Sequence, residues 1–336
     1  MIPKKLEKGD EIRIIAPSRS LANLDFNRNE YAKRKLEGYG FKVSISKYAN
    51  DTDFAKSPSI QKRVDDLHTA FLDKNVKAIL TATGGYNVNQ ILKYIDYDII
   101  KENPKIICGY SDITALLNAI YSKTGLVTYH GPHLFNFGMD KGFEYTYAYF
   151  EKMLLQYENF EICPSDEWSN DCWWKDQENR EFIKNDGMFI INEGEADGKI
   201  VGGNLCTLNL LQGTEFMPDL SDKILFIEDD DMAGNKFQYE FDRNLESLLQ
   251  LSCANKIKGI VFGRAEKDCN MNSDLWKAIV KNKPILNKIP IIGGCDFGHT
   301  TPMITFPIGG EVKMQAHKNE IKLTIINIIT NKLNKR

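Results

Sequence analysis

Short apolar runs alternate with amphipathic stretches over the first part of the chain. The apolar runs predict buried strands over residues 12–16, 41–45, 78–82, 106–108 and 126–129. Between them, residues 26–38 show a polar helix pattern, and Val64, Leu67, Phe71 and Leu72 mark the apolar face of another helix. Strands that alternate with helices are typical of a parallel sheet covered by helices on both sides. The pattern therefore predicts an α/β fold, in which ligands bind at the carboxyl ends of the strands.

A second set of elements begins near Met188. Apolar runs predict strands over residues 199–201, 224–228, 259–263 and 289–293, and helix patterns fall at 205–211 and 245–249. Residues 312–325 alternate between apolar and polar positions, which predicts an antiparallel hairpin. The chain is thus expected to fold as two domains, 1–165 and 188–336.

The segment between these domains differs from both. A helix is expected over residues 144–155, and an irregular stretch rich in tryptophan follows it. Long irregular segments in compact proteins often serve as functional lids. We interpret residues 166–187 as a linker that forms such a lid.

Ser111 has the most informative position in the sequence. The apolar run at 106–108 breaks at Gly109 and leads into a helix with Ile113, Leu116 and Ile120 on one face. A serine at such a sharp strand-to-helix turn projects its hydroxyl clear of the sheet, next to free N–H groups of the new helix. This position predicts a nucleophile. The alternative is a serine that merely caps the helix.

A nucleophilic serine needs a base, and the base needs an orienting group. His299 follows an apolar strand in a loop, and Glu228 ends the strand at 224–228, where a carboxylate needs a partner. We expect His299 to accept the proton of Ser111 and Glu228 to orient His299. The alternatives are an exposed loop histidine and a strand-end salt bridge.

Gly84 and Gly85 follow the third predicted strand, where glycine lets backbone N–H groups approach a ligand closely. We expect the backbone N–H groups of Gly85 and Asp112 to form an oxyanion hole. A phosphate-cradling turn is the rival interpretation, but neither GxGxxG nor GxxxxGK[ST] occurs in the sequence.

Metal sites are weakly indicated. His130 and His133 flank a Gly-Pro pair that forbids a helix, and the sequence contains no HExxH. Asp229, Asp230 and Asp231 are expected to form a solvated turn, since their spacing matches no calcium loop. We therefore expect no metal site.

Composition narrows the range of partners and compartments. A formal net charge of -3 gives no electrostatic case for nucleic acid or an anionic membrane. Seven cysteines without a CxxC pair suit reduced thiols, and the charged start of the chain lacks an apolar signal core. We expect a cytoplasmic protein without a membrane segment.

Together these segments resemble the LD-carboxypeptidase family of serine peptidases, and most of all its microcin C self-immunity branch. The matching stretches are residues 83–89, 96–98, 103–117, 202–205, 213–218, 224–229 and 296–300. The resemblance implies a flavodoxin-like parallel-sheet N-terminal domain and a mixed α/β C-terminal domain with a small barrel. It also implies a Ser111–His299–Glu228 triad in the cleft between them, no cofactor and a homodimer.

The resemblance also bears on the substrate. It implies a serine carboxypeptidase or amidase acting on a small peptide or aminoacyl-nucleotide and, as a consequence, resistance to microcin C-like toxins. It places Tyr86, Asn87 and Asn204 near substrate and stacks a tryptophan on it, either Trp174 or, in the other register, Trp173. The acidic residues after Glu228 depart from the branch and disfavour a phosphate-bearing substrate.

Two alternatives stay open. The first is a murein tetrapeptide LD-carboxypeptidase. The second is a two-domain protein that binds a small ligand in the same cleft without chemistry, since the fold alone does not require catalysis.

Overall fold

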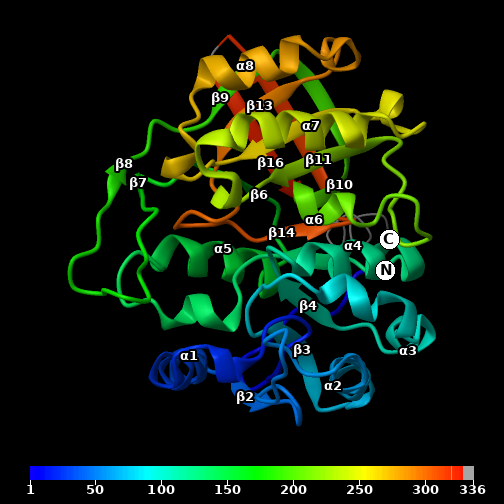
Figure 1. Cartoon of the computed structure of the whole chain (residues 1–336), viewed down its shortest axis with the longest axis vertical. Helices are drawn as coiled ribbons and strands as arrows, with labels where there is room; N and C mark the ends of the chain where they lie inside the picture. The colour runs from blue at the N-terminus through cyan, green and yellow to red at the C-terminus, as the bar shows by residue number, and fades with distance from the viewer. Residues whose placement is uncertain (319, 328–336) are drawn as a thin grey trace.

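The computed structural model describes residues 1–318 and 320–327, which form two large sheets, a two-stranded sheet and surrounding helices. Figure 1 shows the N-terminal elements in its lower half and the later elements in its upper half. The expected hairpin at 312–325 is confirmed, apart from position 319, which lies outside the described residues. No helix in the described part of the chain is long and apolar enough to cross a bilayer.

The first sheet has the order β14-β5-β4-β3-β1-β2. Its five N-terminal strands are parallel and follow the flavodoxin-like order 2-1-3-4-5, which confirms the expected fold class. The strands are β1 (Glu11–Ile15), β2 (Lys42–Ile45), β3 (Val76–Thr81), β4 (Ile106–Gly109), β5 (Thr128–His130) and, antiparallel at the edge, β14 (Phe306–Ile308).

The helices of this half follow the predicted apolar faces. Ile113, Leu116 and Ile120 of α4 are fully buried, whereas Leu72 is 52% exposed and lies off the predicted face of α2. Asp25 caps α1 by accepting a hydrogen bond from the Arg28 N–H. The helices are α1 (Phe26–Gly38), α2 (Ile60–Leu72), α3 (Tyr97–Glu102), α4 (Ile113–Thr124) and α5 (Glu144–Leu154).

The second sheet is mixed, with the order β6-β16-β15-β10-β11-β12-β13-β9. Strands β10 to β13 are parallel and the others pair antiparallel. The strands are β6 (Phe160–Glu161), β9 (Phe189–Asn192), β10 (Gly194–Asn204), β11 (Lys223–Glu228), β12 (Gly259–Gly263), β13 (Ile291–Cys295), β15 (Glu311–His317) and β16 (Glu320–Ile326). The helices are α6 (Leu205–Asn209), α7 (Phe237–Leu249) and α8 (Ser273–Lys281).

The order of the second sheet leaves β6 and β9 at its two edges among the described residues, so the small barrel stays a prediction. The domain boundaries also stay a prediction. Two short strands pair with the sheet of the other expected domain. Strand β14, from the second domain, joins the first sheet, and β6, from the first domain, joins the second sheet.

Helix α4 joins the two halves. The Asn118 side chain donates to the Gly202 carbonyl at 2.7 Å, and the Thr114 hydroxyl accepts from the Asn204 N–H at 3.0 Å. A Cβ at Gly203, whose φ is +119°, would lie 2.5 Å from the Thr114 hydroxyl. Only glycine therefore lets β10 approach the helix so closely.

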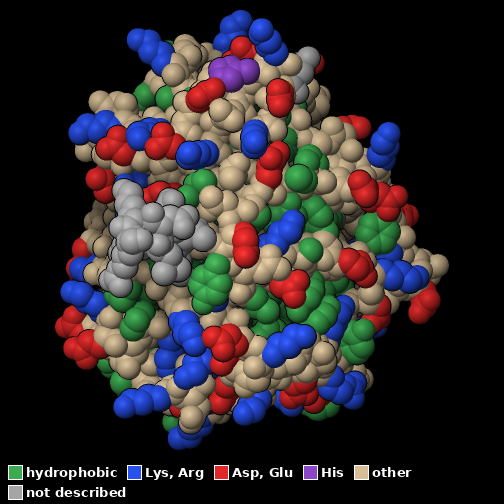
Figure 2. Space-filling model, turned by 180° about the vertical axis from the view of Figure 1, so that it is seen from behind, with side chains coloured by type: hydrophobic (Ala, Val, Ile, Leu, Met, Phe, Trp, Pro, Cys, Tyr) green, Lys and Arg blue, Asp and Glu red, His purple; other side chains and the backbone are tan. Residues whose placement is uncertain are grey.

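Residues 167–184 fold back on themselves. Two short strands, β7 (Glu167–Trp168) and β8 (Ile183–Lys184), pair antiparallel and project from the body at the left of Figure 1. On the face shown in Figure 2, Lys and Arg side chains are interspersed with Asp and Glu, so this face carries no field of a single sign.

Candidate active site

Ser111 stands between β4 and α4 in a left-handed conformation, with a φ of +59°. For a residue with a Cβ this conformation costs about 1–2 kcal/mol, because the Cβ crowds the backbone. The same strained turn exposes the nucleophile in α/β-hydrolases. Its presence at Ser111 indicates that the rest of the fold holds the hydroxyl in this position despite the conformational free energy that the turn costs.

A continuous hydrogen-bond chain links Ser111, His299 and Glu228. The His299 Nε2 lies 3.0 Å from the Ser111 Oγ, and the His299 Nδ1 lies 2.8 Å from the Glu228 Oε2. Glu228 is buried at the end of β11. In the pairing of β11 with β10 it lies opposite Asn204, whose N–H donates to Thr114 of α4. The helix that begins after Ser111 thus also aligns the strand that carries Glu228.

The loop that carries His299 has its own anchor. Asp296 is buried and accepts from the Arg264 guanidinium at 2.6 Å and from the Ser165 N–H at 2.7 Å. On the other side, the Tyr110 ring lies edge-on to the His299 ring, with centroids 5.4 Å apart. The sequence did not predict these three contacts, because each joins residues far apart in the chain.

The carboxylates around His299 favour its protonated form. Burial alone would lower the pKa of His299, but the charge and hydrogen bond of Glu228, with Glu266 and Asp230 nearby, raise it above 6.5. Burial raises the pKa of Glu266 to about 7, and burial together with Glu228 and Asp230 raises the pKa of Asp229 to about 7. Asp229 is 8% exposed, so the expectation that it lies in a solvated turn is wrong for this residue.

Gly84 lies beside Ser111, and Gly85 lies against Ser18. An ideal Cβ on Gly84 would be 2.9 Å from the Ser111 Oγ and 3.6 Å from the Asp112 backbone nitrogen. Over residues 1–318 and 320–327, no protein group accepts a hydrogen bond from the Gly85 or the Asp112 N–H. Both backbone donors are therefore free to bind another group.

The Asp112 side chain has a role that the sequence did not indicate. One of its carboxylate oxygens accepts from the Ser18 hydroxyl at 2.6 Å and from the Asn87 and Val88 N–H groups, each at 2.9 Å. Burial raises the pKa of Asp112, although these hydrogen bonds oppose the shift. The carboxylate ties the loop after β3 to the turn that carries Ser111.

The predicted substrate contacts differ in how free their side chains are. Asn87 is buried and bonds to Ser57 and Arg63, and Asn204 is buried, caps α6 and donates to Asp229. Both side chains are thus engaged with neighbouring protein groups. Tyr86 is 69% exposed and its hydroxyl lies 3.5 Å from the Met232 sulfur, so it reaches across to the second half of the chain.

The two lid tryptophans also differ in how far they are buried. Trp173 is 5% exposed and packs against Phe135, with ring centroids 4.6 Å apart. Trp174 is 46% exposed, with Phe135 6.2 Å away. Trp173 therefore fixes the segment to the body, and Trp174 is the one that offers free ring surface.

The other histidines near the site belong to the core. His130 and His133 are fully buried, and burial lowers the pKa of His130 to about 3 and that of His133 well below 6.5. His133 Nδ1 lies 2.7 Å from the Thr81 hydroxyl. In the described ranges, one group has metal-ligand spacing, namely Cys206, Asp229 and Asp230, with ligand atoms within 4.8 Å of one another.

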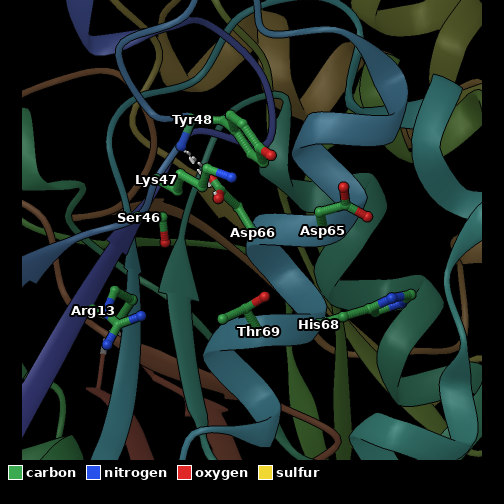
Figure 3. Close-up of a pocket in the computed structure, with 8 residues that line it drawn as sticks. All are labelled: Arg13, Ser46, Lys47, Tyr48, Asp65, Asp66, His68 and Thr69. Carbon is green, nitrogen blue, oxygen red and sulfur yellow. Dashed lines mark hydrogen bonds between the residues drawn. The ribbon is translucent and has the colours of Figure 1, made fainter.

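Two cavities open in the first half of the molecule. The larger, of about 360 Å³, lies between β2 and α2 and is lined by residues that include Arg13, Asp66 and His68 (Figure 3). Asp66 points to the Tyr48 backbone there, and burial raises the pKa of its carboxyl to about 6. No member of the Ser111–His299–Glu228 chain lines it. The smaller, of about 260 Å³, is lined by residues that include Gly85 and Tyr86. Gly85 follows Gly84, which lies against Ser111.

Known proteins share both halves of this chain. Residues 12–131 match the LD-carboxypeptidase N-terminal domain and residues 197–314 match the LD-carboxypeptidase C-terminal domain. The chain belongs to the LD-carboxypeptidase family. This family is one of peptidases, so the chain has the fold and the sequence pattern of a peptidase hydrolase.

Relatives cover nearly the whole chain. YocD of Bacillus subtilis (strain 168), named provisionally as a carboxypeptidase, is 52% identical over 316 residues, 94% of this chain and 96% of that protein. The microcin C7 self-immunity protein MccF of Escherichia coli is 32% identical over 335 residues, 96% of each chain.

Solved structures agree with these matches. An MccF-like protein from Bacillus anthracis str. Ames has a TM-score of 0.96 at 52% identity and covers 97% of this chain and 99% of that one. MccF in complex with glutamyl sulfamoyl guanosine has a TM-score of 0.85 at 30% identity, with 96% and 98% covered.

Proposed function

We propose that the chain is a serine hydrolase that cleaves an amide in small peptide or aminoacyl-nucleotide substrates through an acyl-enzyme. The observation that carries the proposal is the hydrogen-bond chain from Ser111 through His299 to Glu228, with distances of 3.0 and 2.8 Å. A binding protein would not need an alcohol, an imidazole and a buried carboxylate in this order.

In the proposed mechanism, neutral His299 takes the proton of Ser111 as the Ser111 Oγ attacks the scissile carbonyl carbon. Glu228 holds the imidazole in place and stabilises the imidazolium that forms. The free N–H groups of Gly85 and Asp112 bind the oxyanion. His299 then protonates the leaving amine, and in the second half of the cycle it deprotonates the water that releases the acyl group.

Aminoacyl nucleotides are our first choice of substrate, with resistance to microcin C-like compounds as the result of cleaving them. MccF is a self-immunity protein and has been solved with glutamyl sulfamoyl guanosine, which supports this choice. The exposed ring of Trp174 supports it as well, since bases stack on aromatic side chains. We also propose the homodimer that the family resemblance implies.

Murein tetrapeptide is the second candidate, and one observation favours it. Asp230 and Glu266 lie close enough to His299 to raise its pKa, which makes this side of the site acidic. An acidic site suits a substrate with a free amine, such as the diamino acid of murein, better than a phosphate.

Parallel turnover assays test the proposal. The purified protein is given aspartyl sulfamoyl adenosine and a murein tetrapeptide, and products are separated by liquid chromatography. We expect hydrolysis of at least one, and the substrate that is cleaved assigns the branch. Binding of either compound without any hydrolysis would instead support the non-catalytic alternative.

A further inference from the structure

The smaller cavity, beside Gly85, has a lining that the proposed mechanism does not use. It is formed by Ser18, Arg19, Phe54, Lys56, Gly85 and Tyr86, with Ala55 and Ser57 completing it. These residues come from three loops, after β1, before α2 and after β3. All three loops lie at the carboxyl ends of their strands or lead away from them, where ligands of parallel sheets bind.

The cavity is attached directly to the candidate oxyanion hole. The Arg19 N–H donates to the Gly84 carbonyl at 3.2 Å, and Gly84 in turn lies against Ser111. An ideal Cβ on Gly85 would be 2.1 Å from the Ser18 hydroxyl. The loop that carries Arg19 is thus one glycine away from the group that would attack the substrate.

The charges in the cavity are positive and unpaired. In the described residues, neither the Arg19 guanidinium nor the Lys56 ammonium has an ion-pair partner within 4.0 Å, whereas other arginines such as Arg13, Arg180 and Arg264 do. A partly buried guanidinium without an acceptor next to a reaction centre is suited to bind a carboxylate or a phosphoryl-like group from the substrate.

Aromatic surface flanks these cations. Phe54 is 99% exposed and Tyr86 is 69% exposed, and both line the cavity. Exposed rings beside an arginine can cover the apolar part of a ligand while its charged end meets the guanidinium. The carboxylates of Asp230 and Glu266 lie near His299 and are not among the residues that line this cavity.

We propose that this cavity is the subsite for the anionic group of the substrate, with Arg19 as its main partner. The inference rests on the proposed hydrolase function and sets the direction of the substrate. The anion lies on the Arg19 side of Ser111, and any free amine lies on the Glu266 side. The anion is either the terminal carboxylate of a peptide or the sulfamoyl or phosphoryl group of a nucleotide.

The test compares Arg19→Gln with Arg34→Gln, a matched change at an exposed arginine of α1. Three probes are used: a murein tetrapeptide, the same peptide with a C-terminal amide, and aspartyl sulfamoyl adenosine. We expect Arg19→Gln to lower kcat/KM by about 10- to 100-fold for an anionic probe, mainly through KM, because one charged hydrogen-bonding partner is lost. The preference for the peptide acid over its amide should collapse, and Arg34→Gln should match wild type.

If Arg19→Gln lowers kcat/KM for the tetrapeptide alone, the anion that binds in the cavity is a carboxylate. If it lowers kcat/KM for the nucleotide alone, the anion is the sulfamoyl group. Equal effects of Arg19→Gln on acid and amide, together with no effect on the nucleotide, would overturn the proposal.

A binding measurement separates this proposal from the hydrolase function. If wild type hydrolyses no probe, the function fails, and calorimetry on Ser111→Ala with and without Arg19→Gln still tests the cavity. A Kd weakened about 10- to 100-fold for an anionic probe supports it. An unchanged Kd, or no binding of either anionic probe, contradicts it.

Discussion

Gly84 lies so close to Ser111 that no side chain fits between them. A Cβ at position 84 would be 2.9 Å from both the Cβ and the Oγ of Ser111, closer than real Cβ contacts come. Gly84 therefore sets the distance between the loop after β3 and the candidate nucleophile.

Gly84→Ala should displace the Ser111 hydroxyl from His299 and lower kcat by at least about 100-fold, since a shift of ~1 Å costs that much in a preorganised site. Gly38→Ala is the control, because a Cβ at Gly38 meets no atom within 4 Å. Turnover and circular dichroism are measured for both. A Gly84→Ala protein as active as the control would show that the close approach is not needed.

The pH dependence follows from the carboxylates near His299. A base must be neutral, so kcat/KM should rise with pH through the pKa of His299. The sequence alone places this rise at about pH 6 to 7, and the raised pKa of His299 moves it upward.

Glu266→Gln removes one of the charges that favour the imidazolium, so it should lower the pKa of His299 and move the rise to lower pH. Glu102→Gln, at an exposed position of α3, is the matched control. Full pH–rate profiles of kcat/KM measure the effect. An unmoved profile, or one moved to higher pH, would contradict the electrostatic role of Glu266.

The two lid tryptophans should respond differently to truncation. Trp173→Ala removes a buried ring and should cost about 3–5 kcal/mol of unfolding free energy. Trp174→Ala should change stability by less than about 0.5 kcal/mol. It should also raise KM for aspartyl sulfamoyl adenosine about 10-fold, the effect of losing a stacked base. Urea unfolding and initial-rate kinetics measure these, and the reverse pattern would favour Trp173 as the stacking residue.

Local signals in the sequence were sufficient for most elements. Helix α1 occupies the predicted residues 26–38, because its capping residue and its end are both local features. Strand β14 was not predicted, since three residues that include Pro307 show no alternation. Proline is tolerated there because β14 lies at the edge of the sheet.

The sequence indicated the three central residues of the candidate site, but not the contacts of the residues around them. Each of Ser111, Glu228 and His299 follows an apolar strand, and this local position is visible in the sequence. The carboxylate bonds of Asp112, the burial of Asp229 and the unpaired charge of Arg19 depend on loops that meet only after folding. For the same reason Asn87 and Asn204, expected to contact substrate, have their side chains engaged with neighbouring protein groups.

The central claim is that the Ser111 hydroxyl is the nucleophile. The most direct measurement is the turnover of Ser111→Ala, with whichever of the two substrates wild type hydrolyses. We expect kcat to fall by about 10⁴- to 10⁶-fold, because the members of a triad act as a unit. If the folded Ser111→Ala protein kept more than about a tenth of wild-type turnover, the nucleophile assignment would be contradicted.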